Sequence, residues 1–164
     1  KRNLSEYNDK LQMQIIDYFN CGRQEYWLSQ IKKSDWGAGQ YLFNLLRENK
    51  LKEVVGENPR VLMLTNGDEL VSFCTYTEKD DIQPTELTPW IGFVYTFPKY
   101  RGHRYVGELF LEIERLAKSE QVHDIFISTD HIGLYEKYGF EFYQTMKDMN
   151  GEPSRVYRKC MLVS

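Results

Sequence analysis

The residues best suited to chemistry form a short basic loop, Lys99-Tyr100-Arg101-Gly102-His103-Arg104. The loop follows Pro98, which ends an apolar run from Trp90 to Thr96 that is rich in strand-forming residues. After the loop, apolar residues recur at three- and four-residue steps as far as Ala117, which predicts an amphipathic helix. The first N–H groups of a helix lack partners within it and lie at the positive end of its dipole, so the loop predicts an anion site. The arginines and the histidine of the loop favour a phosphate or pyrophosphate as the anion.

The loop has two other interpretations. It could be a positively charged surface loop beside a core helix, because short glycine-containing loops match phosphate motifs by chance. It could also belong to a nucleotide P-loop, since Gly102 and Gly107 have the right spacing, but Glu108-Leu109 follows where lysine and serine or threonine are required. A dinucleotide-binding fingerprint is absent from the sequence.

A second segment, Gly133 to Phe140, reads Gly-Leu-Tyr-Glu-Lys-Tyr-Gly-Phe. Together with the loop it resembles the two signatures of the GNAT family of N-acetyltransferases, Arg/Gln-x-x-Gly-x-Gly/Ala before a helix and Leu/Phe-Tyr-x-x-x-Gly-Phe before a strand. Arg101 matches the first position of the first signature, whereas Arg104 and Val106 stand where the family has glycines. Glycine there permits close approach of the backbone to the phosphates. With Arg104, the loop must open slightly or the guanidinium must contribute directly.

The resemblance implies an enzyme that transfers the acetyl group of acetyl-CoA to a primary amine by direct attack in a ternary complex, without an acyl-enzyme. Tyr135 would be the general acid that protonates or stabilises the leaving thiolate, although without the family the better interpretation is a core aromatic residue. In the family the strand before the loop splays from its neighbour, so the backbone of Val94 and Thr96 would pair with the pantetheine arm and the thioester carbonyl. Ser128, Thr129 and Asp130 would touch that arm or the acceptor, or else cap a helix. The residues expected to bind the coenzyme are Val94, Tyr95, Thr96, Arg101, Gly102, His103, Arg104, Tyr105, Val106, Ser128, Asp130 and His131.

The general base is less clearly marked. Relatives often carry a carboxylate on or near the corresponding strand, but the strand at Trp90 has none. We rank Glu86 first as the catalytic base, with Asp80, Asp81, His131 and ordered water as the alternatives. These acids belong to an acidic connection, 78–86, which is either a solvated loop or a surface that attracts a cationic amine.

The bulk composition narrows the class of protein. The chain has 164 residues, of which 41% are hydrophobic and 15% aromatic, which fits one globular domain over 1–164 with 1–12 as an N-terminal extension. A net charge of −3 does not support binding to nucleic acid, and no apolar run reaches the ~20 residues that span a bilayer. We expect no metal, because the three histidines lack metal-ligand spacing. The three scattered cysteines favour reduced thiols and a cytoplasmic protein.

The elements that must position these residues follow from the hydrophobic pattern. Trp36 to Gly39 interrupts the first helical pattern, and Asn66-Gly67 predicts a type I′ hairpin turn. Thr129-Asp130 can cap the last helix, with Gly139 at its end. The expected strands are Met13–Tyr18, Val61–Thr65, Glu69–Thr77, Trp90–Thr96, Asp124–Ser128, Phe140–Met146 and Arg155–Leu162, and the expected helices span about 26–33, 41–49, 104–118 and 131–138.

This order predicts an α/β (α+β) fold of the acyl-CoA N-acyltransferase type. We expect a central mixed, mostly antiparallel sheet of about seven strands, with about four helices on its faces and strands splayed at the cofactor site. The expected partner is a small-molecule or peptide amine, and the sequence leaves a homodimer open. Two rival functions are a non-catalytic acyl-CoA-binding sensor or regulatory domain on the same fold, and a structural domain that binds no coenzyme.

Overall fold

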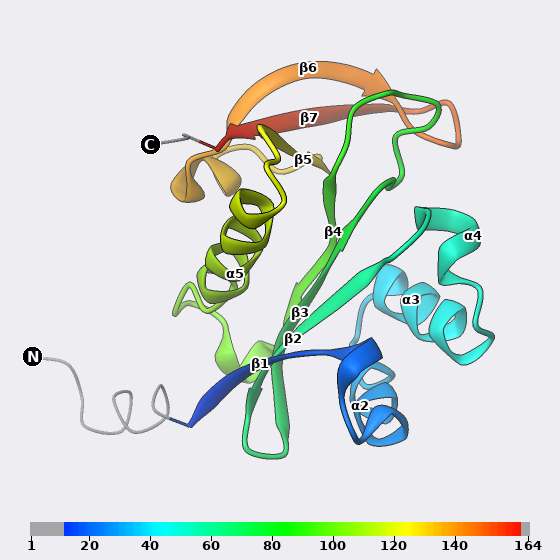
Figure 1. Ribbon diagram of the computed structural model, residues 1–164, viewed down its shortest axis with the longest axis vertical. Helices are drawn as coiled ribbons and strands as arrows, with labels where there is room; N and C mark the ends of the chain where they lie inside the picture. The colour runs from blue at the N-terminus through cyan, green and yellow to red at the C-terminus, as the bar shows by residue number, and fades with distance from the viewer. Residues whose placement is uncertain (1–11, 162–164) are drawn as a thin grey trace, which may run out of the picture. The chain divides into compact units, whose positions relative to one another are not determined.

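The computed structural model describes residues 12–161 (Figure 1). Within them, seven strands and three of the four expected helices follow in the predicted order. One further α-helix was not predicted, and one of three short 3-10 turns stands where the fourth helix was expected. The strands are β1 (Met13–Asp17), β2 (Arg60–Asn66), β3 (Glu69–Thr77), β4 (Trp90–Thr96), β5 (Asp124–Thr129), β6 (Glu141–Lys147) and β7 (Pro153–Cys160). The helices are α2 (Gln24–Ile31), α3 (Gly37–Arg47), α4 (Leu51–Val55) and α5 (Val106–Ser119), and the 3-10 turns are η1 (Tyr18–Asn20), η2 (Pro98–Tyr100) and η3 (Tyr135–Tyr138).

The strands form one sheet in the order β1-β2-β3-β4-β5-β7-β6. β4 and β5 are parallel, whereas β1 with β2, β5 with β7, and β6 with β7 are antiparallel. The predicted mixed sheet of about seven strands with about four helices is therefore confirmed for the described part of the chain. β5, β7 and β6 lie side by side in Figure 1.

The described residues group into two compact units. The first unit comprises 12–50, Arg60–Cys74 and Phe93–Leu109, and the second comprises Leu51–Pro59, Thr75–Gly92 and 110–161. The elements β3, β4 and α5 each begin in one unit and end in the other. The interpretation of the whole chain as one domain stays a prediction. Most of the expected N-terminal extension (1–12) and Leu162, the expected end of the last strand, lie outside the described residues.

In the first unit, the start of α3 differs from the prediction. The segment Trp36 to Gly39 was expected to interrupt the helical pattern, but α3 begins at Gly37. Glycine is disfavoured in a helix interior and much less so in the first turn. Gly39 also has a packing role, since a methyl group in place of its α-hydrogen would lie 2.2 Å from Ser34 Oγ. The helix therefore starts on the residues that were expected to separate it from α2.

The hairpin between β2 and β3 has a different turn from the predicted one. The two residues that link the strands are Gly67 and Asp68. Gly67 has a φ of 59°, whereas neither Asn66 nor Asp68 has a positive φ. A type I′ turn requires positive φ at both central residues, so that prediction is wrong. A left-handed residue at the first central position alone is typical of a type II′ turn.

In the second unit, the core lies between the end of the acidic connection and the sheet. Ile82, Trp90, Phe126 and Val156 form a buried cluster, against which Leu87 and Met146 pack. Each fully buried side chain of this size contributes about 1.5–3 kcal/mol through loss of apolar surface to water. Helix α4 was not predicted, because its five residues are too few to show a helical period.

The last expected helix, 131–138, is reduced to the single 3-10 turn η3. Gly133 adopts a left-handed φ of 86°, which a continuous α-helix does not accommodate. Thr129 Oγ1 accepts from the N–H of His131 at 3.1 Å, and η3 has no side-chain cap, so the predicted Thr129-Asp130 cap is wrong. Gly139 ends η3 in the left-handed conformation, with a φ of 90°, as predicted.

Candidate functional site

The basic loop leads from η2 into the first turn of α5. Its backbone is left-handed at two positions, with a φ of 88° at Gly102 and 56° at Arg104. A side chain in this conformation costs roughly 1–2 kcal/mol, which glycine avoids. Arg104 stands where the family signature has its first glycine, yet its backbone keeps the conformation that suits glycine. The Arg104 side chain is exposed, and both alternatives for its role stay predictions.

Two N–H groups at the start of α5 are already bonded. The N–H of Gly107 donates to the carbonyl of Arg104, and that of Glu108 donates to the carbonyl of Tyr105, both at 3.0 Å. These 3-10-type bonds tighten the first turn of the helix. An anion at this end of α5 must therefore bind N–H groups that precede Gly107.

Arg101 lies back along β4. Its Nε donates to the carbonyl of Thr96 at 2.9 Å, and its guanidinium lies 5.4 Å from the centre of the Tyr95 ring. One guanidinium nitrogen is 3.9 Å from Asp35 Oδ1, and the side chain is half exposed. Both the Arg101 side chain and the Thr96 carbonyl were expected to contact the coenzyme, but in this structure they are hydrogen-bonded to each other. Their roles stay predictions.

Asp35 is a residue that the sequence analysis missed. The Tyr95 hydroxyl donates to Asp35 Oδ1, and the ring of Tyr95 stacks on Trp36 at 5.7 Å. The hydrogen bond from Tyr95, together with the charge of Arg101, lowers the pKa of Asp35. Burial and the same hydrogen bond raise the pKa of Tyr95. Asp35 thus positions the side chains of Tyr95 and Arg101, and it lies in a connection between helices where no periodic pattern marks it.

The regular pleat of β4 is broken at its fourth residue, Phe93. The parallel register with β5 comprises Trp90↔Phe126 and Ile91↔Ile127. Gly92 follows, and then Phe93 with a φ of 50°. A positive φ at a bulky residue inside a strand is a genuine outlier, and strain of this kind clusters at functional sites. The pleat is therefore interrupted immediately before Val94, the first residue expected to meet the coenzyme.

Tyr135 is held by aromatic neighbours of the second unit. Its side chain is 6% exposed, and its ring centre lies 6.1 Å from that of Phe110 and 6.3 Å from that of Phe140. These contacts fix the ring, as a core position would. The general-acid role of the hydroxyl stays a prediction.

The three residues at and after the end of β5 that were expected to bind the coenzyme differ in their surroundings. Ser128 Oγ lies 2.7 Å from Ser154 Oγ and donates to Asp81 Oδ2 at 3.3 Å, so its hydroxyl is already engaged. Asp130 and His131 are exposed. Ser128 thus connects β5 to the acidic connection, a link that its position in the sequence did not reveal.

The acidic connection is a fixed loop between β3 and β4. Gln83 Nε2 donates to the carbonyls of Val54 (2.9 Å) and Asp80 (2.8 Å), and the N–H of Met149 donates to the carbonyl of Asp81 at 2.9 Å. Glu86, ranked first as the base, is exposed, whereas Asp80 is partly buried. Burial and the neighbouring charge of Asp81 raise the pKa of Asp80 well above its ordinary value.

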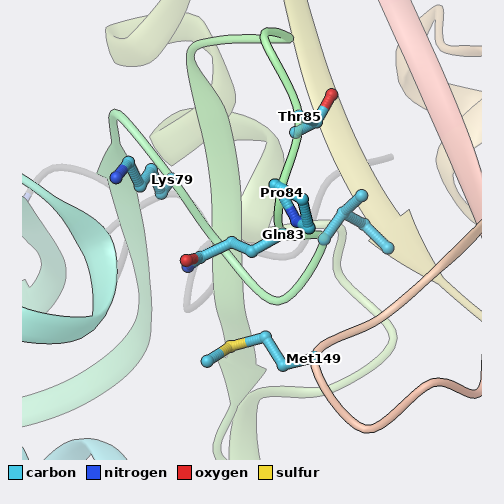
Figure 2. A pocket seen from close by; sticks show the side chains of 6 residues that line it. Lys79, Gln83, Pro84, Thr85 and Met149 are labelled. Carbon is cyan, nitrogen blue, oxygen red and sulfur yellow. The ribbon is translucent and has the colours of Figure 1, made fainter.

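A pocket of about 380 Å³ opens in the same loop, and Figure 2 shows its lining side chains. No carboxylate belongs to this lining, so the acidic charge of the connection does not face this hollow. An amine-binding role for the pocket therefore gains no support from charge. The lining residues are Lys79, Ile82, Gln83, Pro84, Thr85 and Met149.

The comparison with known families bears on the resemblance carried by the two signatures. The model of the Acetyltransferase (GNAT) family matches residues 18–140, which include the loop and the whole of the second signature. The chain belongs to the GNAT family. No curated protein sequence matches this GNAT acetyltransferase.

Solved structures show the same fold. The GNAT protein is 21% identical to an acetyltransferase from Streptococcus agalactiae, covering 91% of this chain and 98% of that one with a TM-score of 0.63. An aminoglycoside 6′-N-acetyltransferase complexed with coenzyme A is 12% identical, with coverage of 93% and 98% and a TM-score of 0.63. A spermidine N-acetyltransferase from Vibrio cholerae in complex with CoA and spermine is 10% identical, with coverage of 92% and 96% and a TM-score of 0.58. The predicted fold type and the predicted family are confirmed.

Three properties of the described residues complete this account of the GNAT domain. Cys21, Cys74 and Cys160 are free thiols, and Cys74 is fully buried. Across 12–161, no three side chains of the metal-binding types gather into a group that could hold an ion. None of the helices in that range has the length and apolar character to cross a membrane.

Proposed function

We propose that this protein is an acetyl-CoA-dependent N-acetyltransferase that acetylates a primary amine by direct attack in a ternary complex. The observation that carries the proposal is the left-handed backbone at Gly102 and Arg104 before α5, in a chain of the GNAT family. Coenzyme A is bound in two of the proteins that share its fold, which supports the choice of donor.

The loop would bind the pyrophosphate. Its left-handed residues, Gly102 and Arg104, support this role, because proteins build concave anion sites from alternating right- and left-handed backbone conformations. Arg101 would leave the Thr96 carbonyl and form a charge-assisted hydrogen bond with a phosphate oxygen. That exchange would free the Thr96 carbonyl for an amide N–H of the pantetheine arm.

The chemical step divides between two kinds of group. The amine nitrogen attacks the thioester carbon, a C–N bond forms, and the carbonyl oxygen gains negative charge that a backbone N–H at Val94 would stabilise. The C–S bond then breaks, and Tyr135 would donate a proton to the leaving sulfur. The break in the pleat at Phe93 supports this assignment, because it removes the residues after it from regular strand geometry.

The acceptor would be a cationic amine of a small molecule or an exposed peptide amine. Two proteins of the same fold are named for an aminoglycoside and for spermidine, which are both polycations. The net charge of −3 suits such a substrate. A non-catalytic acyl-CoA-binding domain is the second candidate, and the replacement of both signature glycines by Arg104 and Val106 favours it.

Two measurements test the proposal. Acetyl-CoA in excess should raise the melting temperature, because a ligand that binds only the folded state stabilises it by mass action. Release of the free thiol should then be measured with polyamines, aminoglycosides and peptides as acceptors. Turnover of one of them supports the enzyme. Coenzyme binding without turnover supports the second candidate, and the absence of coenzyme binding contradicts both.

A further inference from the structure

Gly92 makes room for a carboxyl group on β4. A methyl group in place of its α-hydrogen would lie 2.1 Å from Asp80 Oδ1 and 2.7 Å from Asp80 Cγ. Glycine weakens a strand interior, and there it often marks a close approach of another group. Only glycine at this position allows Asp80 to lie against the strand, two residues before Val94.

A buried hydroxyl faces the same place. Thr75 Oγ1 would lie 3.0 Å from the methyl group that Gly92 lacks. This oxygen is fully buried, and no partner for it exists among the described residues. An unsatisfied buried hydroxyl costs about 1–3 kcal/mol, so its retention beside a carboxyl group calls for an explanation. Thr75 Oγ1 and the Asp80 carboxyl thus lie beside the same missing methyl group.

Asp80 acts together with Asp81. The two carboxyl groups are close enough to affect each other, since the negative charge of Asp81, after burial, raises the pKa of Asp80. Asp81 is held from its other side by Ser128 of β5, whose hydroxyl also contacts Ser154 of β7. Burial raises the pKa of Asp81, and the negative charge of Asp148, in the turn after β6, raises it further. The pair therefore carries one proton and one negative charge over the pH range between its two titrations.

We propose that Asp80 is the general base of the acetyl transfer and that Asp81 is its positioning residue. This inference rests on the proposed function. In the step, an N–H bond of the acceptor ammonium breaks and an O–H bond forms on Asp80, while the proton shared by the pair passes to Asp81. The charge of the pair changes from −1 to 0 and that of the amine from +1 to 0, so the step balances.

The environment distinguishes Asp80 from Glu86. Glu86 is exposed, and a solvated carboxylate is too weak a base to remove a proton from an alkylammonium ion efficiently. Asp80 is sheltered enough to be a stronger base yet still partly accessible, and it lies beside Gly92 of β4. Two hydrogen bonds hold the backbone of Asp80 in this position. Gln83 Nε2 donates to the Asp80 carbonyl, and the N–H of Met149 donates to the carbonyl of the next residue, Asp81.

The test compares Asp80→Asn, Glu86→Gln and the control Glu53→Gln, which changes an exposed acid on α4. The measurement is the pH profile of kcat/KM for thiol release with the amine of the panel that the wild type acetylates. Asp80→Asn should lower kcat/KM by about 10²–10⁴-fold near neutral pH, the usual contribution of a general base. The loss should shrink as the pH approaches the pKa of the amine, where free amine needs no base.

Two further variants separate the catalytic role from a structural one. Gly92→Ala retains both carboxyl groups but displaces Asp80, so it should reproduce the loss of Asp80→Asn, and the double variant should lose little more. Asp81→Asn removes a like charge from beside Asp80, so the acid limb of the profile should move to lower pH.

The outcomes distinguish this inference from the proposed function. A wild type that acetylates its amine, with Asp80→Asn equally active at every pH, overturns the role of Asp80 and leaves the proposed function standing. The same holds if Glu86→Gln alone is inactive. A wild type that turns over none of the amines overturns the proposed enzyme and this inference with it. Retention of the acetyl-CoA thermal shift in Asp80→Asn shows that the variant is folded and binds the donor.

Discussion

The loop before α5 and the segment from Thr129 to Gly139 each carry a family signature, yet they fold by different rules. Both contain two left-handed residues, Gly102 and Arg104 in the first and Gly133 and Gly139 in the second. The first pair lies before a helix of 14 residues, which continues unbroken. The second pair brackets η3, which has four residues. The position of a left-handed residue relative to the apolar pattern decides whether a helix forms.

The comparison also separates two kinds of site residue. In the loop, backbone conformation should matter most, because the proposed phosphate site consists largely of N–H groups. Around η3, the side chain of Tyr135 should matter most, because its ring is held in place by Phe110 and Phe140. Variants at the two places should therefore affect different measurements.

The largest effect is expected for Tyr135→Phe. Loss of the hydroxyl removes the proposed acid, so kcat should fall by about 10²-fold or more, while the affinity for acetyl-CoA changes little. The aromatic packing is retained, so the melting temperature should stay close to that of the wild type. Steady-state thiol release and calorimetric titration check this, with Tyr138→Phe as the matched control. Unchanged turnover would remove Tyr135 from the mechanism.

A smaller effect, on binding, is expected for Arg101→Ala. Hydrogen bonds to charged groups contribute about 1.5–3 kcal/mol, so the dissociation constant for acetyl-CoA should rise by roughly 10–100-fold. Arg115→Ala, which removes an exposed arginine of α5 that pairs with Glu112, is the control. An unaltered dissociation constant in Arg101→Ala would refute the phosphate contact.

The glycines of the two regions should differ in their tolerance of alanine. Both Gly102→Ala and Gly139→Ala force a side chain into the left-handed region, at a cost of roughly 1–2 kcal/mol in the free energy of unfolding. The new methyl group at position 102 meets nothing within 4 Å, whereas at position 139 it would lie 3.0 Å from Lys159 Cε. Urea unfolding should therefore show the larger loss for Gly139→Ala. Equal losses would mean that Lys159 moves aside freely.

Stability should depend on pH through Asp80. Its pKa is raised by burial, so the folded protein retains a proton that the unfolded chain releases near the ordinary value of 3.8. The stability that this proton contributes is present below 3.8 and is lost as the pH rises through the raised pKa. Asp80→Asn, which stays neutral, should be more stable than the wild type near neutral pH, and the difference should vanish toward pH 3.8. Parallel unfolding curves at all pH values would contradict the raised pKa.

The smallest effect on stability is expected for Arg104→Gly. Relief of the left-handed strain is offset by the greater freedom of glycine in the unfolded chain, so the free energy of unfolding should change by at most about 1 kcal/mol. Weaker binding of acetyl-CoA by this variant would show that the guanidinium contacts the phosphates. Tighter binding would show instead that the arginine obstructs a loop that glycine serves better.

The sequence was sufficient wherever the apolar pattern was long. β4 has the predicted bounds, Trp90 to Thr96, because proline ends an unbroken run of strand-forming residues. α5 was found from an apolar stripe that spans four turns. The family signatures singled out the loop and Tyr135 as candidate site residues. Neither signature predicted the left-handed backbone of Arg104, which is a conformation usually adopted by glycine.

The contacts that were missed are tertiary. No local sequence pattern predicts that Asp80 lies beside Gly92. Their contact depends on hydrogen bonds from the loop between them to α4 and to Met149, which are distant in sequence. Asp35 likewise meets Tyr95 across 60 positions of sequence. The sequence analysis therefore ranked Glu86 above Asp80 and Asp81 as the catalytic base, because the sequence does not reveal which of these carboxyl groups the loop places next to β4.

The most direct test of the central claim is hydrogen exchange of the backbone amides from Gly102 to Val106, measured with and without saturating acetyl-CoA. If this loop holds the pyrophosphate, the coenzyme should slow exchange at these amides, and Arg101→Ala should weaken the protection at a fixed coenzyme concentration. Tight binding of acetyl-CoA with unchanged exchange at all of these amides would contradict the account.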